Sequence, residues 1–166
     1  MAYMTLVAAV PQQQIDAIRD DERIMLTPTL VTGVSHLLGY WIQLQPLGGL
    51  LARTINGGEL LNATFWHPLR PPMFHRPDQV ASIACELEQE WATIRRNPGF
   101  HDEWLELEME RLITVLTHAR YNASAVVTAL GPTADQKRAE RIRIPWQAYS
   151  PTQGDLRRPW WMLWRR

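Results

Sequence analysis

The sequence predicts a single α/β domain, a compact arrangement of one sheet and its helices in three layers, followed by a C-terminal extension. Two short apolar runs, at residues 3–10 and 124–130, are typical of buried strands. Two long stretches between residues 77 and 121 repeat apolar residues at helical spacing. A length of 166 residues with 46% hydrophobic residues suits one globular core. An α+β arrangement of the same elements stays open.

The N-terminal third predicts one strand and two helices. Residues 3–10 form the first strand, and Pro11 suits the first turn of a helix that continues to about Arg19. A second helix is expected after Thr27-Pro28, because five apolar residues follow at helical spacing. They are Leu30, Val34, Leu37, Leu38 and Trp41.

The middle of the chain is rich in glycine. Pro46-Leu47-Gly48-Gly49 and Asn56-Gly57-Gly58 predict loop and turn across residues 46–60. No Gly-Lys-Ser/Thr sequence opens a helix there, which argues against a phosphate-binding P-loop. Residues 60–75 are irregular, with room for a short strand.

Two helices and a strand close the predicted domain. The first helix opens at Pro77-Asp78 and the second runs from about His101 to Tyr121. The first apolar stripe comprises Val80, Ile83, Ala84, Leu87, Trp91 and Ile94. The second comprises Leu105, Met109, Leu112, Val115, Leu116 and Ala119. Residues 124–130 then form a buried strand that ends at Gly131-Pro132.

Several short motifs occur in an order that points to a family. Leu38-Gly39-Tyr40-Trp41 precedes Ile55-Asn56-Gly57-Gly58, and Arg70-Pro71-Pro72-Met73-Phe74 precedes Pro77-Asp78-Gln79-Val80. Leu107-Glu108-Met109-Glu110-Arg111-Leu112-Ile113 and Ala125-Val126-Val127 follow. In this order they resemble the YfbM-like family of bacterial domains of unknown function, over residues 2–130. The resemblance implies a compact three-layer α/β fold and carries no established activity.

The net charge of zero is the sum of two parts of the chain that carry opposite net charges. Residues 1–130 hold nine arginines and fourteen acids, a net charge of −5, whereas residues 131–166 hold eight basic residues and three acids, a net charge of +5. We therefore divide the chain into a domain at 1–130 and a basic, Trp-rich extension at 131–166. Such halves suggest a tail that docks on its own body or on a partner.

The chain lacks the signals of secretion and of membrane insertion. The single cysteine, Cys85, excludes an intramolecular disulfide framework. No apolar run reaches the roughly 18–20 residues of a membrane span, and the apolar start lacks a basic flank. We expect a cytoplasmic protein.

Histidines and tryptophans in the middle of the chain suggest a pocket. It would lie between residues 46–58 and 65–75, near Trp41 and Trp66. His67, His75 and Asp78 are of the types found in a 2-His-1-carboxylate metal site, but their spacing matches no recognised pattern. We expect no metal and no cofactor.

One carboxylate on the last predicted helix falls at a position where an apolar residue is expected. Glu108 falls about 40° from Leu112 on a helical wheel, inside the apolar stripe. A desolvated carboxyl there, near His101 and Trp104, would have a raised pKa and could act as a general acid or base. A hydrogen bond to a neighbouring group is the simpler interpretation.

Cys85 is a weaker candidate for chemistry. It lies opposite the apolar stripe of its helix, and only His118 and His36 offer themselves as a base. No catalytic residue is predicted.

The extension is the strongest functional signal. Four of the eight tryptophans lie in the last 21 residues, among arginines. The expected anchors and charged contacts are Trp146, Trp160, Trp161, Trp164, Arg157, Arg158, Arg165 and Arg166. Trp and Arg are enriched at binding hot spots. Docking on the chain's own body or on a second copy, a protein partner, and an anionic membrane surface are the competing interpretations, in that order. The acidic body argues against nucleic acid.

The leading hypothesis is a non-enzymatic interaction or assembly protein that uses this tail to dock. One alternative is a small-molecule binding protein or enzyme whose pocket includes Trp41, Trp66, His67, His75 and Glu108. Another is an immunity-type inhibitor, in which the acidic body blocks a basic toxin.

Overall fold

The structure, a computed structural model, describes residues 3–21, 24, 26–35, 46–61 and 72–132. Its elements in chain order are β1 (Tyr3–Val10), α1 (Gln12–Asp20), β2 (Leu30–Ser35), α3 (Leu47–Asn56), β3 (Glu59–Leu60), β4 (Met73–His75), α4 (Pro77–Arg95), α5 (Glu103–Tyr121) and β5 (Ala125–Pro132). The last strand extends two residues beyond the predicted domain boundary.

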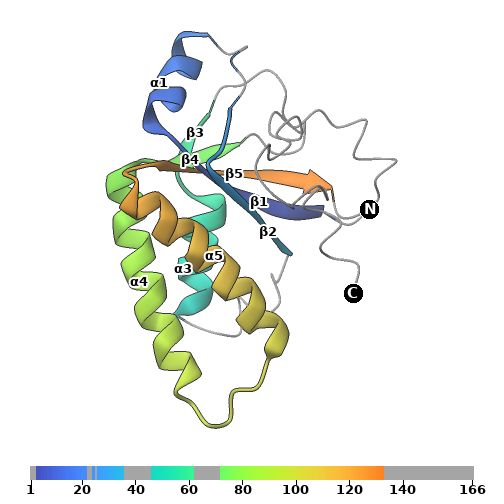
Figure 1. Cartoon of the computed structure of the whole chain (residues 1–166). Coiled ribbons are helices and arrows are strands. Elements are labelled where there is room, and N and C mark those ends of the chain that lie inside the picture. Colours follow the sequence, from blue (N-terminus) through green and yellow to red (C-terminus); the bar gives the residue numbers. More distant parts are fainter. Residues whose placement is uncertain (1–2, 22–23, 25, 36–45, 62–71, 133–166) are drawn as a thin grey trace, which may run out of the picture.

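The five strands form one antiparallel sheet in the order β2-β1-β5-β4-β3. The first and last strands of the chain are therefore central neighbours, and Val7 of β1 lies opposite Thr128 of β5. Helices α3, α4 and α5 lie on one side of the sheet and α1 on the other (Figure 1). These three layers confirm the predicted α/β fold class.

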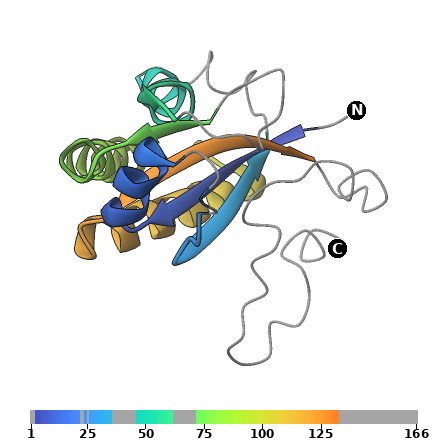
Figure 2. The ribbon, with the colours of Figure 1, turned by 90° about the horizontal axis from the view of Figure 1, so that it is seen from above.

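Each face of the sheet carries its own core. Val7 and Ala9 of β1 pack in the core with α3, α4 and α5, whereas Leu6 and Ala8 pack in the core with α1. Alternate residues of a strand point to opposite faces. A central strand covered on both faces is therefore apolar on both, which is why residues 3–10 are nearly all apolar, with Thr5 as the polar exception. Figure 2 shows the strands crossing above α5.

The two long helices confirm the predicted stripes. Val80, Leu87 and Trp91 of α4 are buried, as are Leu105 and Leu112 of α5. The turn between the helices is closed by the rings of Trp91 and Phe100, which meet edge to face with centroids 5.6 Å apart. The carboxylate of Asp102 caps α5 by accepting the backbone N–H of Leu105. Among the described residues no helix is both long and apolar enough to cross a bilayer.

Residues 30–35 are a strand, so the prediction of a helix from Thr27-Pro28 through Leu30 and Val34 was wrong. β2 pairs with β1 along its whole length, with Val34 opposite Thr5. The β-branched Val31, Thr32 and Val34 favour a pleated strand. The remaining residues of the predicted helix lie outside the described ones.

Residues 47–56 form a helix, so the prediction of loop and turn across residues 46–60 was wrong as well. Leu47, Leu50, Leu51, Thr54 and Ile55 repeat at helical spacing and are buried against the sheet. Gly48 and Gly49 lie in the first turn, where their low helix propensity is outweighed by the tertiary packing of the apolar face. Only Gly57 and Gly58 remain in a turn.

Candidate functional site

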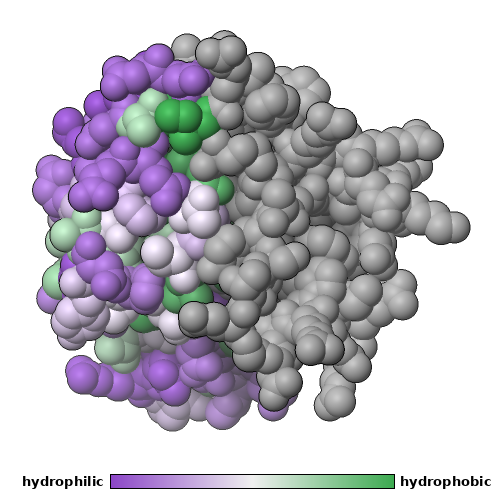
Figure 3. Space-filling view, turned by 45° about the horizontal axis from the view of Figure 1, so that its top comes forward, coloured by the Kyte–Doolittle hydropathy of each residue, from purple (hydrophilic) through white to green (hydrophobic). Residues whose placement is uncertain are grey.

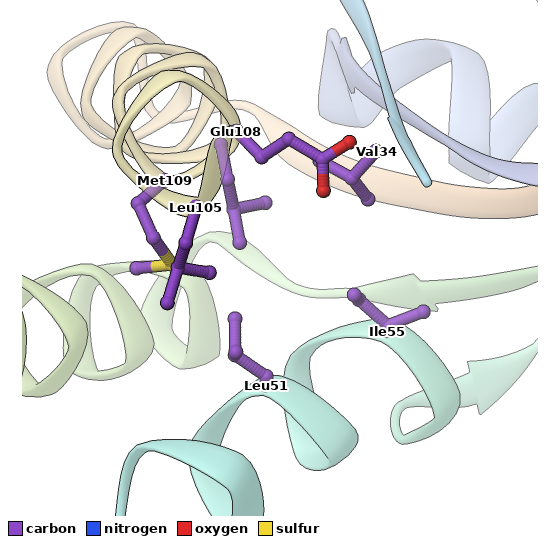
Figure 4. A pocket seen from close by; sticks show the side chains of 7 residues that line it. Val34, Leu51, Ile55, Leu105, Glu108 and Met109 are labelled. Atoms are coloured by element: carbon purple, nitrogen blue, oxygen red, sulfur yellow. The ribbon is translucent and has the colours of Figure 1, made fainter. Parts of the chain in front are cut away.

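A small pocket opens where α3, α5 and the end of β2 meet (Figure 4). It is lined by Val34, Leu51, Ile55, Leu105, Glu108, Met109 and Leu112. About 10 Å³ of it is open to the centre of a water molecule, which is room for one water. Small-molecule pockets are typically about 300–1,000 Å³. As the described residues form it, this pocket fits water and not a metabolite.

Glu108 supplies the polar group of this pocket. Its side chain is 2% exposed, and its carboxylate lies toward Val34 at the end of β2 (Figure 4). Thr5 and Thr128, both buried, lie on the same face of the sheet, since Thr5 is opposite Val34 and Thr128 is opposite Val7. The sequence prediction that Glu108 lies in the apolar stripe is therefore confirmed. A buried carboxylate is costly unless polar groups compensate for its lost hydration.

The two other residues predicted near Glu108 lie elsewhere. His101 precedes α5 and is exposed, and Trp104 is 56% exposed on the surface of the helix. The carboxylate of Glu108 is therefore buried, whereas the ring of Trp104 lies on the surface.

His75 forms a hydrogen bond with the C-terminal turn of α3. Its Nε2–H donates to the carbonyl of Thr54 at 2.9 Å, and the hydroxyl of Thr128 donates to the carbonyl of Ile55 at 3.0 Å. The last carbonyls of a helix have no partner within it and need donors from outside. Strands β4 and β5 supply these donors, so His75 has a structural role at the joint of helix and sheet.

Burial lowers the pKa of His75 below the ordinary value of 6.5, and hydrogen bonds with the backbone of Thr54 and Arg53 oppose part of this fall. The folded protein thus holds the ring neutral, whereas the unfolded chain takes up a proton below about pH 6.5. The stability that His75 contributes is complete above pH 6.5 and is lost as the pH falls toward its lower pKa in the folded state.

We expect the substitution His75→Gln to weaken this dependence on acid, because glutamine offers an N–H donor without a titratable ring. The free energy of unfolding, measured by urea titration between pH 7.5 and 5, should fall more steeply for the wild type than for the variant. Equal slopes for the two proteins would contradict the assignment.

Of the three residues considered above for a metal site, the structure describes His75 and Asp78. His75 is committed to Thr54, and the side chain of Asp78 is 76% exposed, 3.8 Å from Arg76. His67, Trp41 and Trp66 lie outside the described residues. Within the part of the chain that the structure describes, no three His, Cys, Asp or Glu side chains gather as a metal site.

Cys85 is exposed on α4, as predicted, and its neighbour is Arg120 of α5. The Nη1–H of Arg120 donates to the sulfur at 3.4 Å and also contacts Glu88 at 3.4 Å. His118, the described candidate for a base, contacts the hydroxyl of Thr29 at 3.1 Å instead. His36 lies outside the described residues.

The outer surface of α5 carries a feature that sequence reasoning missed. Trp104 and Leu107 lie one turn apart and are 56% and 47% exposed, and Glu103 and Glu110 beside them are exposed too. We call these four residues the α5 strip. On the face shown in Figure 3 most of the described surface is hydrophilic, with small hydrophobic areas. The predicted anchors of the extension (residues 146–166) lie outside the described residues.

The crystal structure of YfbM from Escherichia coli, a protein of unknown function, is similar to this fold. The match has a TM-score of 0.50 and 13% sequence identity, and it covers 76% of this chain and 99% of the YfbM chain. The fold is thus YfbM-like, as the sequence motifs suggested. No protein-family model and no curated protein matches the chain.

Proposed function

We propose that this YfbM-like domain is a non-enzymatic interaction or assembly protein that docks through its C-terminal extension. The observation that carries the proposal is the composition of residues 157–166, in which three tryptophans lie between two pairs of arginines. A tryptophan buries a large apolar area, and arginine adds directed hydrogen bonds to carboxylates. Both residue types dominate the energetics of protein interfaces.

The described surface supports an interaction role. Trp104 and Leu107 are neighbouring apolar side chains that are both exposed, and such residues mark binding surfaces when they form a patch. The small pocket beside Glu108 has room for about one water molecule, which is too little for a small-molecule substrate. The exposed apolar side chains therefore favour binding of a partner over binding of a substrate in this pocket.

We further propose that the protein acts in the bacterial cytoplasm. Cys85 is free and exposed, which suits a reducing compartment. The similar solved structure comes from a bacterium.

Shortening the chain to residues 1–144 tests the docking role of the extension. We expect the shortened chain to lose self-association or the capture of a protein partner, because the four tryptophans of the extension are removed. Light scattering after size exclusion gives the mass, and a pull-down gives the capture. Circular dichroism must first show that the shortened chain keeps its cooperative thermal unfolding. Unchanged mass and unchanged capture in a folded truncation would refute the proposal.

A further inference from the structure

The α5 strip has the form of a docking surface with an apolar centre. Leu107 lies on the side of α5 opposite its buried stripe and Trp104 lies at the edge of that stripe, at 47% and 56% exposure. Tyr121, at the other end of the same helix, is an exposed aromatic too, but the guanidinium of Arg120 stacks on its ring at 5.4 Å. Among the described aromatic and cation–π contacts, none involves Trp104.

The exposed carboxylates of the strip lie along one side of it, and Arg111 lies on the other side, between Trp104 and Leu107 on the helical wheel. Glu103 and Glu110 are exposed one turn before and one turn after Leu107, on the side of the helix away from Trp104, and the ion pairs of the described residues include neither carboxylate. Glu106, by contrast, lies 3.8 Å from Arg95. An apolar centre bordered on one side by carboxylates is complementary to a segment in which tryptophans lie between pairs of arginines, as in residues 157–166.

The extension begins on the sheet that α5 covers. Val34 lines the same pocket as Leu105 and Glu108, and its register partner is Thr5. Thr5 in turn lies opposite Leu130 of β5. Two strand spacings, about 10 Å, therefore separate Val34 from the last residues of the domain. In Figure 1 β5 ends on the right of the sheet, whereas α5 begins lower down, beside the turn from α4, so the residues after β5 must cross from the sheet to the helix to reach the strip.

We propose that the α5 strip is the docking site for residues 157–166 of the same molecule. The connecting residues 133–156 number 24, and a free chain of that length has an end-to-end distance of about 27 Å. Such a linker gives an effective concentration in the millimolar range, which favours the chain's own segment over that of a second copy in dilute solution. Tryptophans of the segment cover Trp104 and Leu107, and its arginines meet Glu103 and Glu110.

This contact goes beyond the proposed function, since it forms without any partner. Its consequence for the docking role rests on that function: a partner that binds the extension must displace it from α5. Weakening the strip should then strengthen capture of the partner, whereas deleting the extension abolishes capture.

Amide hydrogen exchange of the full-length protein, read on the peptide that covers residues 157–166, tests the contact. We expect protection in the wild type, and exchange at least 10-fold faster in Trp104→Ala and in the double variant Glu103→Arg/Glu110→Arg. Tyr121→Ala is the matched aromatic control and should keep the protection. Adding Arg157→Glu/Arg158→Glu to the double variant should restore part of it.

Two results would overturn the proposal. One is a C-terminal peptide that exchanges as fast in the wild type as in the α5 variants. The other is protection that disappears on dilution, which would assign the contact to a second copy. Neither result bears on the loss of capture in the 1–144 truncation, so this inference and the proposed function fail separately.

Discussion

Replacing Gly58 by alanine is expected to cost about 1–3 kcal/mol of unfolding free energy from backbone strain alone. Gly58 has a φ of +99°, a conformation that residues with a side chain rarely adopt. A Cβ there would also lie 2.5 Å from the carbonyl oxygen of Phe74 and 3.2 Å from the ring of His75. The first neighbour is backbone of β4, so the clash is relieved only by moving the strand.

Gly99→Ala is the matched control for this substitution. Gly99 lies in the exposed turn before α5, and the nearest atom to an added Cβ is the side-chain oxygen of Asn97 at 3.5 Å. We expect a change within about 0.5 kcal/mol for this variant. Denaturant unfolding measures both. A Gly58→Ala protein as stable as Gly99→Ala would contradict the described turn between α3 and β3.

Truncating Leu112 to alanine should destabilise the domain by about 2–5 kcal/mol. Leu112 is 1% exposed, lies in the core between α5 and the sheet, and lines the pocket beside Glu108. Removing its isobutyl group loses apolar burial and enlarges a space that already admits a water molecule.

The same substitution five residues earlier should behave differently. Leu107 is 47% exposed, so Leu107→Ala should change the unfolding free energy by less than about 0.5 kcal/mol. It should nevertheless release the C-terminal segment in hydrogen exchange, because it removes half of the apolar centre of the α5 strip. Equal destabilisation by Leu112→Ala and Leu107→Ala would mean that α5 packs on the sheet with a different face from the one described.

Long periodic segments were predictable from sequence and short ones were not. The apolar stripes lie on helices of 19 residues each, α4 and α5, and β1 and β5 are mostly apolar because both faces are covered. β2 was mistaken for a helix because Leu30 and Val34 are four residues apart by chance, while Val31 and Thr32 favoured a strand. α3 was mistaken for a loop because Gly48 and Gly49 have low helix propensity. Its apolar residues nevertheless repeat at helical spacing, and their tertiary packing stabilises the helix.

In the candidate site, too, some features were predictable from sequence and others were not. The burial of Glu108 followed from its angle on the helix, which is a local property. The role of His75 did not, since its partner Thr54 is 21 residues away and meets it only after α3 folds onto the sheet. The exposure of Leu107 could have been found in the same way, since it lies opposite the apolar stripe, whereas the exposure of Trp104, at the edge of the stripe, depends on which helices cover α5.

A photo-crosslinking amino acid in place of Leu107, in the full-length protein, tests most directly whether the extension docks on α5. After irradiation of a dilute mixture of ¹⁵N-labelled and unlabelled chains, mass spectrometry identifies the joined peptides. The account predicts a crosslink to residues 157–166 in which both peptides carry the same label. Crosslinks that join labelled to unlabelled peptides, or that reach other segments and not residues 157–166, would contradict it.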